Sequence, residues 1–224
     1  MKQFTLRTAL ILSVAAIAAA ETAQERLASA AEVFQEVMST PDKGIPQDLL
    51  AKAQCVIIVP GLKKGAFVVG GEFGRGFAEC RKSEGFGWGP PAAVRVEGGS
   101  VGFQIGGSST DVVMLVMNRH GMQKLLGDKF TLGADASVAA GPVGRTADAS
   151  TDARMNAEIL AWSRARGVFA GISLKGATLR NDSDTNAELY GHRIDNKEII
   201  GGAVEAPASA EALHAVLDKY SMRK

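Results

Sequence analysis

A serine within a glycine-rich segment is the residue best suited to nucleophilic chemistry in this 224-residue chain. Gly98-Gly99-Ser100-Val101-Gly102 matches the pattern G-x-S-x-G, and His120, His192 and His214 follow it as candidate bases. A nucleophile elbow needs a strand, a sharp turn and then a helix, so that the serine oxygen projects above the sheet. Another strand pattern follows this turn. We therefore interpret the segment as a β-turn and expect no catalytic residues and no enzyme.

Two other glycine-rich segments resemble nucleotide sites only in part. Residues 102–109 lack the lysine that contacts the phosphates in a P-loop, and no helix pattern follows them. Residues 70–76 do not fit G-x-G-x-x-G. Both segments join strand patterns, so tight turns account for their glycines. We expect no cofactor.

The acidic residues of one segment copy the first ligands of a calcium loop. Residues 182–186 read Asp-Ser-Asp-Thr-Asn, but Ala187 and Arg193 stand where the loop requires glycine and glutamate. The cysteines and histidines never cluster at zinc-ligand spacing. The sequence predicts a turn that leads into a short helix, and no metal site.

Composition and charge exclude further classes of protein. Lys and Arg number 25 against 24 Asp and Glu, and 46% of the residues are hydrophobic. The apolar share fits a globular domain, and the balanced charge argues against a nucleic-acid binder that works through a broad basic field. The 26 glycines make up about 12% of the 224 residues, against an average of about 7% in proteins. They indicate many tight turns or close backbone approaches.

The first 20 residues resemble a secretory leader. Lys2 and Arg7 precede an uncharged, apolar stretch that ends in three alanines at residues 18–20. This pattern predicts a signal peptide cleaved after Ala20, because the stretch is shorter than the roughly 20 residues of a membrane-spanning helix. We expect residues 21–224 to form one exported domain, periplasmic or secreted.

Cys55 and Cys80 are the two cysteines of the chain. Export would permit a disulfide between them, provided that strand pairing brings them together. The alternative is two reduced, buried cysteines that act as small hydrophobic residues.

Hydrophobic periodicity predicts helices at both ends of the exported domain. Residues 22–38 form an amphipathic pattern, residues 47–53 and 119–126 form short ones, and a last helix begins near Ser209. Asn118 is the expected cap of the third helix. The apolar stripe of the first helix consists of Leu27, Ala30, Ala31, Phe34, Val37 and Met38.

Strand patterns fill the region between these helices. They cover residues 55–59, 66–69, 76–80, 92–96, 101–105, 112–117, 134–145, 159–162 and 167–179. Their close spacing favours antiparallel pairing, and the small residues in the last segments indicate close sheet packing. The expected fold is α+β, with a Gly-rich antiparallel β-sheet, open or barrel-like, an N-terminal amphipathic helix, short helices and a C-terminal helix.

Several sequence blocks occur in a defined order. They are VIIVP at 56–60, GAFVVGG at 65–71, GWGPP at 87–91, GFQIG at 102–106, TDVVMLVMN at 110–118, FTLGAD at 130–135, AAGPVGR at 139–145 and GVFAGISLKG at 167–176, with Asn186 and Tyr190-Gly191. Together they resemble the SYLF domain family, also called the actin-binding domain of yeast actin-patch proteins. The resemblance covers residues 27–202.

The resemblance implies lipid binding without catalysis. Eukaryotic SYLF proteins bind phosphoinositide-containing membranes, with an N-terminal amphipathic helix implicated, and some bind and bundle actin. The expected leader and the lack of an SH3 or FYVE module look like the exported bacterial members. We therefore carry over a general lipid-binding role, regard actin and phosphoinositides as doubtful partners, and leave protein partners unknown.

Two sets of residues are candidates for lipid contact. The first is the apolar stripe of residues 22–38, which could enter a lipid interface or pack on the protein's own sheet. Arg26 faces three glutamates on the polar side of this helix, so electrostatics would not favour an anionic surface there. The second set comprises the head-group candidates Lys63, Lys64, Arg75, Arg164 and Arg166.

The sequence thus predicts an exported, non-enzymatic protein of the cell envelope that binds phospholipid or a membrane surface. The alternative is a structural or protein-interaction module of the envelope without a lipid ligand.

Overall fold

The computed structural model describes residues 21–40, 44–66, 69–82, 87–101, 106–144, 157–165 and 168–221. The predicted leader, residues 1–20, lies outside this part of the chain, as does the head-group candidate Arg166. Among the described residues, no helix combines the length and the apolar composition needed to cross a bilayer.

Helices and strands follow one another in the predicted α+β arrangement. The helices are α1 (Ala23–Ser39), α2 (Gln47–Lys52), α3 (Arg119–Leu125), α5 (Ser183–Tyr190), α6 (Asn196–Ile200), the 3-10 turn η1 (Ala208–Ala210) and α7 (Glu211–Ser221). The strands are β1 (Cys55–Ala66), β2 (Val69–Cys80), β3 (Ala92–Val101), β4 (Gly106–Val116), β5 (Lys129–Thr131), β6 (Val138–Ala140), β7 (Ile159–Ala165), β8 (Val168–Gly171) and β9 (Thr178–Asn181).

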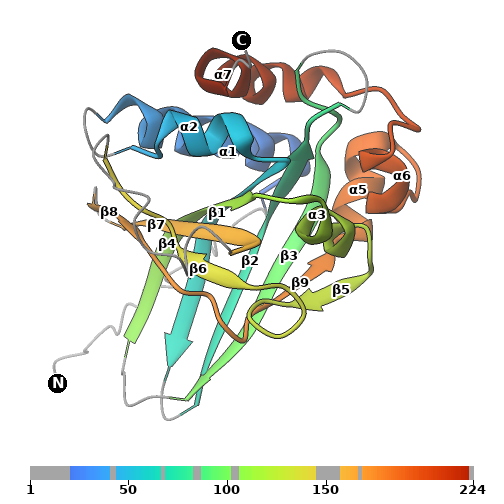
Figure 1. Cartoon of the computed structure of the whole chain (residues 1–224). Coiled ribbons are helices and arrows are strands. Elements are labelled where there is room, and N and C mark those ends of the chain that lie inside the picture. Colours follow the sequence, from blue (N-terminus) through green and yellow to red (C-terminus); the bar gives the residue numbers. More distant parts are fainter. Residues whose placement is uncertain are drawn as a thin grey trace, which may run out of the picture.

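The nine strands form one curled sheet, a half-barrel, in the order β5-β9-β3-β2-β1-β4-β7-β6, with β8 also paired to β7. Every pair is antiparallel except β6 with β7, which is parallel. In Figure 1, α1, α2 and α7 lie together on one side of the sheet, and the long strands β1 to β4 continue beyond them. The predicted fold class is confirmed.

The four long strands correct the sequence prediction of several short ones. We expected a strand to end at Val59, but β1 continues through Pro60 and Gly61 to Ala66. Pairing with both β2 and β4 shifts register at this point, and Gly61 adopts a φ of 58°. A proline is tolerated there because a bulge does not require its missing N–H. Of the predicted strand 66–69, Ala66 ends β1 and Val69 begins β2, and residues 67 and 68 lie outside the described residues. Residues 76–80, predicted as a separate strand, are the last part of β2.

The two faces of the sheet bury different clusters. One face, which we call the helix face, packs Val56, Ile58 and Phe77 against α1 and α7. The other, which we call the inner face, is closed by α3 and by residues from both ends of the sheet. Phe130 of β5 and Val138 of β6 meet in that inner cluster, which follows from the curl of the sheet.

Glycine permits close packing in the second half of the sheet, as its small residues predicted. A Cβ atom on Gly141 would collide with the ring of Trp162, and one on Gly171 would collide with the Gly141 carbonyl. The predicted cap of the third helix is confirmed. The side chain of Asn118 accepts a hydrogen bond from the Gly121 amide at 2.8 Å, and Asp182 caps α5. Helix α6 was not predicted.

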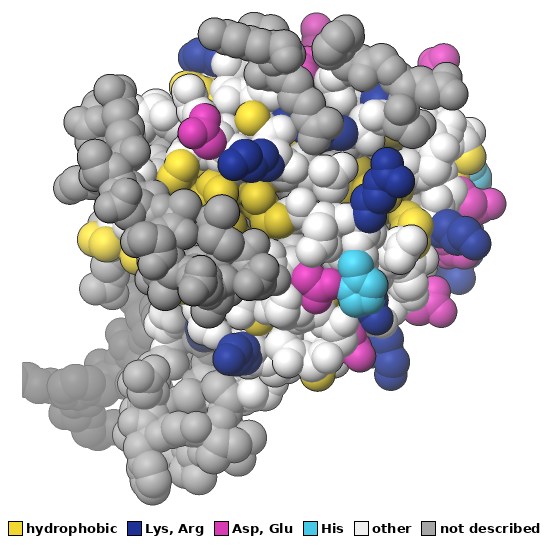
Figure 2. Space-filling model, viewed as in Figure 1, with side chains coloured by type: hydrophobic (Ala, Val, Ile, Leu, Met, Phe, Trp, Pro, Cys, Tyr) yellow, Lys and Arg dark blue, Asp and Glu magenta, His cyan; other side chains and the backbone are white. Residues whose placement is uncertain are grey.

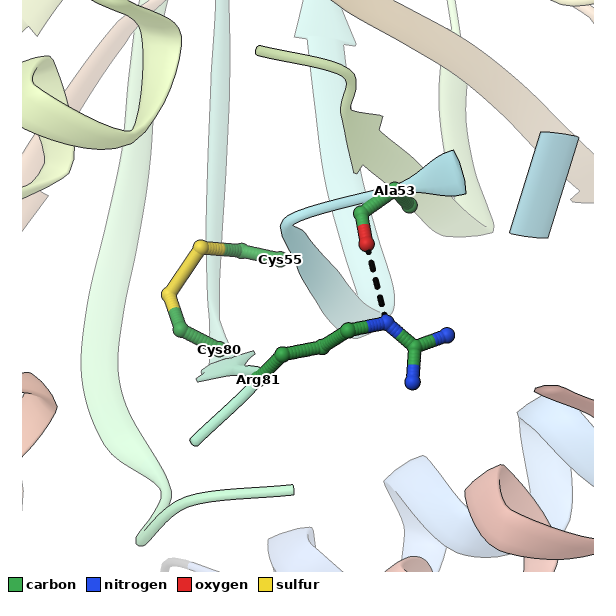
Figure 3. The surroundings of a disulfide bond; sticks show 4 residues. All are labelled: Ala53, Cys55, Cys80 and Arg81. Atoms are coloured by element: carbon green, nitrogen blue, oxygen red, sulfur yellow. Dashed lines mark hydrogen bonds between the residues drawn. A yellow bond between two sulfur atoms is a disulfide. The ribbon is translucent and has the colours of Figure 1, made fainter. Parts of the chain in front are cut away.

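A disulfide joins Cys55, at the start of β1, to Cys80, at the end of β2 (Figure 3). The two residues are direct partners in the antiparallel pair. Beside the disulfide, Nε of Arg81 donates a hydrogen bond to the Ala53 carbonyl at 3.1 Å. The disulfide and this hydrogen bond fasten the segment before β1 to the end of β2.

Candidate functional site

The apolar stripe of α1 is buried in this structure. Leu27 and Phe34 are completely buried, and the rest of the stripe packs in the same cluster, with Met38 at its margin. The stripe therefore occupies the second of the two positions considered for it, against the protein's own sheet and α7. It could contact lipid only if α1 left the sheet.

Arg164, a predicted head-group residue, is used within the fold. Its guanidinium on β7 donates to Asp111 Oδ2 of β4 at 2.7 Å and forms an ion pair with Glu36 of α1. Asp111 in turn accepts a hydrogen bond from the Gly61 amide at 2.9 Å. Arg164 thereby links α1 to the sheet at the bulge of β1.

The head-group candidates Lys63 and Lys64 lie within β1, after the bulge. Because the extra residue at the bulge reverses the alternation, Leu62 faces inward and Lys63 shares the helix face with its β2 partner Phe73. Lys64 points to the opposite side, where Nζ lies 3.0 Å from Glu72 Oε2. The two lysines therefore cannot act on one ligand.

Arg75, the remaining head-group candidate, belongs to a row of four basic residues. It is the direct partner of Arg95 on β3, which pairs with Arg180 on β9, which pairs with Lys129 on β5. Directly opposed residues point to the same face of a sheet. We call this row the basic ladder. Arg75 lies two residues from Phe77, so the ladder is on the helix face, and its side chains are partly or fully exposed.

Two carboxylates partly neutralise the basic ladder. Glu97 on β3 lies 3.3 Å from both Arg95 Nε and Arg180 Nη1. Asp182 Oδ2 lies 3.2 Å from Arg75 Nε. Four basic residues thus face two acidic ones. Like charges directly opposite each other destabilise a sheet, and such local conflicts in natural proteins are expected at functional sites.

The ladder residues differ in how free they are to meet a partner. Asp182 is fully buried and caps α5, so Arg75 is the counter-ion of a buried charge. Arg95 and Arg180 share one partly exposed carboxylate. Lys129 is exposed and forms no ion pair among the described residues. The outer three members of the ladder, on β3, β9 and β5, are therefore the ones that could turn to a ligand.

An exposed aromatic residue adjoins the ladder. Phe73 lies two residues before Arg75 on the same face of β2, between its partners Lys63 and Glu97, and 46% of it is exposed. Phe73, Lys129 and Arg180 line a hollow of about 510 Å³. The site combines an apolar ring with a row of cations, and these groups suit binding to an anionic surface.

The sequence alone did not reveal most of this site. Arg95, Arg180 and Lys129 were missed because only strand register brings them beside Arg75. A weak local signal exists in residues 94–97, Val-Arg-Val-Glu, whose alternation puts the charged residues on one face of a strand.

The described surface shows no broad field of one charge on the side seen in Figure 2, where basic and acidic side chains are interspersed. Ser100 lies in β3 and β4 is the next element along the chain, so a strand and not a helix follows this serine. The described residues also contain no group of three candidate metal ligands.

These features define a half-barrel module with a local basic site. A family model described as Ysc84, Las17-binding protein actin regulator, matches residues 97–220, more than half of the chain. The chain therefore belongs to the Ysc84 (SYLF) family, and the resemblance seen in its sequence blocks is confirmed.

Three relatives illustrate the similarity. SH3 domain-containing YSC84-like protein 1 of Bos taurus is 34% identical over 191 residues, 84% of this chain and 55% of that protein. An SH3 domain-containing protein of Schizosaccharomyces pombe is 38% identical over 178 residues, 78% of this chain and 41% of the relative. LAS seventeen-binding protein 3 of Saccharomyces cerevisiae is 33% identical over 181 residues, 79% of this chain and 39% of the relative.

The chain spans about half the length of these relatives, or less. The family description and the yeast relative's name refer to binding or regulation, and none of the names quoted is that of an enzyme.

Proposed function

We propose that this protein is a non-enzymatic module that binds the anionic phospholipid surface of a membrane through the basic ladder. The observation that carries the proposal is the register of Arg75, Arg95, Arg180 and Lys129 across four neighbouring strands. An anionic surface supplies the negative charge that the fold leaves uncompensated along this row.

The physical chemistry of the row favours phosphate groups. Guanidinium groups bind phosphate in bidentate geometry, and each basic side chain near an anionic membrane contributes about 1 kcal/mol. The whole chain carries a formal charge of only +1, so attraction must come from such a local cluster. Phe73 can add apolar contact at the interface, where it lies beside the cations. The buried stripe of α1 need not move.

Vesicle co-sedimentation tests this proposal. Wild type is expected to sediment with vesicles that contain phosphatidylserine and to remain in solution with purely zwitterionic vesicles. The double variant that combines Arg95→Ala with Arg180→Ala should lose most of the binding to these vesicles. The matched control removes two charges elsewhere, Arg119→Ala with Lys124→Ala on α3, and should bind as wild type. Equal binding by the two double variants would show that the ladder is not the site.

We also propose export, with cleavage after Ala20, as the leader pattern predicts. The N-terminal residue of the protein purified from periplasm or culture medium tests it directly. Glu21 at the N-terminus is the expected result. An intact Met1 in protein confined to the cytosol would contradict export.

A protein partner is the second candidate. The family description names Las17 binding and actin regulation, and an acidic protein surface could neutralise the same ladder. Sedimentation with actin filaments, using the same two double variants, separates the candidates. Binding to filaments that requires Arg95 and Arg180, together with no binding to any vesicle, would replace the membrane proposal by this one.

A further inference from the structure

A buried carboxyl group lies beneath the C-terminal helix. Glu79 on β2 is 1% exposed, and neither of its carboxyl oxygens has a hydrogen-bond partner in the described structure. Burial raises the pKa of Glu79 well above its usual range, and the negative charge of Asp218 on α7 raises it further. A carboxyl in this position holds its proton more firmly than an exposed one.

In the part of the chain that the structure describes, no lysine or arginine forms an ion pair with Glu79. His214 of α7 is nearest, with Nε2 3.4 Å from Glu79 Oε2 and 3.1 Å from the Gly89 carbonyl. Tyr190 of α5 donates its hydroxyl to the Pro91 carbonyl at 2.7 Å, and burial together with Glu79 raises the pKa of Tyr190. Arg81, directly after β2, donates to the carbonyls of Leu50, Ala53 and Ser221.

The other elements packed on this cluster contribute apolar side chains. Val56 of β1 is the direct partner of Glu79, and both α1 and β3 supply buried apolar residues to the same core. The charged residues of α1 are exposed, except Arg26, which is paired with Glu21. Among these groups, His214 lies closest to the Glu79 carboxyl.

His214 also lies between Glu79 and the solvent. The histidine side chain is 24% exposed and lines a hollow of about 540 Å³ together with Trp88, Pro90 and Gly201. Glu79 lies behind it, away from water. The imidazole therefore separates the carboxyl from the solvent in this hollow.

We propose that Glu79 and His214 form a proton-operated clamp that fastens α7 to the sheet. With a proton on Glu79 the carboxyl is neutral, and α7 packs over it. When that proton is lost to water, a buried carboxylate remains within the electrostatic influence of Asp218. Such a charge can be hydrated only if α7 loosens. Because α7 packs on α1 and Tyr220 accepts a hydrogen bond from Gln35, loosening extends to the helix that covers the sheet.

Hydrogen–deuterium exchange of the full chain tests this clamp, read in peptides of α7 and α1 from about pH 5 to about pH 9 and corrected for the base catalysis of exchange. Wild type should lose protection in α7 as the pH rises, by about tenfold or more across the range. Glu79→Gln should keep its protection. Glu205→Gln, in the wall of the same hollow, should behave as wild type. Identical profiles for wild type and Glu79→Gln would overturn the clamp.

A second measurement covers the case in which Glu79→Gln fails to fold. Infrared spectroscopy of wild type labelled with ¹³C-carboxyl glutamate should show a protonated carboxyl band at neutral pH that disappears as α7 loses protection. A spectrum of ionised carboxylates alone at neutral pH would overturn the proposal, whatever the variant does.

Discussion

Arg95 of β3 lies directly opposite Arg180 of β9, and each has a guanidinium nitrogen 3.3 Å from the carboxylate of Glu97. One partly exposed carboxylate thus serves two cations. Glu97 reduces the repulsion between the two arginines, and the three side chains together still carry an excess positive charge. Binding of the basic ladder to an anionic membrane depends on this excess.

Removing the shared carboxylate should have opposite effects on stability and binding. Glu97→Gln leaves Arg95 and Arg180 opposed without compensation, and should lower the free energy of unfolding by about 0.5–1 kcal/mol. The same change should strengthen binding to anionic vesicles. Urea unfolding and vesicle titration measure the two effects. Weaker vesicle binding by Glu97→Gln would argue that Glu97, and not the cations, contacts the ligand.

Arg75 should matter more for stability than Arg180, which lies two strands away in the ladder. Arg75→Ala leaves the buried Asp182 charge without its counter-ion, and should cost about 1–3 kcal/mol in urea unfolding. Arg180→Ala, in which 41% of the wild-type side chain is exposed, should cost less than about 1 kcal/mol. Equal costs for both variants would show that Arg75 is no more important for stability than Arg180.

The pH dependence of stability should change when Glu79 is replaced by a residue that cannot ionise. The folded-state pKa of this acid is raised above its unfolded value, so the folded state binds more protons between those two values. Stability is therefore full below the ordinary glutamate pKa of about 4.3 and falls as the pH rises toward the raised folded value, by up to about 1.4 kcal/mol per pH unit.

Glu79→Gln should flatten this contribution and be more stable than wild type at alkaline pH. Urea unfolding at several pH values measures the slope. A wild-type curve that rises through the same window, or a variant curve with the same slope, would contradict the assignment to Glu79.

The disulfide should stabilise the fold because it closes a loop and so lowers the conformational entropy of the unfolded chain. Cys55 and Cys80 are separated by 25 residues in the sequence, and a loop of this size corresponds to about 3.5 kcal/mol. The variant with both Cys55→Ser and Cys80→Ser should be less stable in urea unfolding by that amount. Added reductant should lower the free energy of unfolding of wild type toward that of the variant, and should not change that of the variant. An effect of reductant on the variant would point to another cause.

Local sequence patterns were sufficient for the elements whose burial has a simple period. The apolar spacing of Leu27 and Phe34 predicted α1, and Leu213 and Leu217 lie on the buried side of the predicted α7. The interruption at Pro60 misled the strand prediction, because a β-bulge uses proline and glycine as a turn does. The sequence could not show that β1 continues after the bulge, or that the bulge places Lys63 on the helix face.

The basic ladder depends on information that no local pattern contains. Arg75 and Arg95 meet through a hairpin, but Arg180 and Lys129 come from distant parts of the chain and join only because β9 adds to the edge of β3 and β5 adds to β9. Similarly, Glu79 stands in a strand pattern like any polar residue, and its burial follows from the later placement of α7 over β2. The basic ladder and the burial of Glu79 therefore both depend on how distant segments pair and pack in the folded chain.

The most direct test of the ladder is the affinity of wild type and of Arg95→Ala with Arg180→Ala for phosphatidylserine vesicles, titrated at low and at high salt. The loss of two charges near an anionic membrane should weaken binding by roughly 30-fold at low salt, and high salt should reduce that difference. The control variant, Arg119→Ala with Lys124→Ala, should have the same affinity as wild type at low and at high salt. An unchanged affinity of the ladder variant at low salt would contradict the claim that this row of cations binds the membrane.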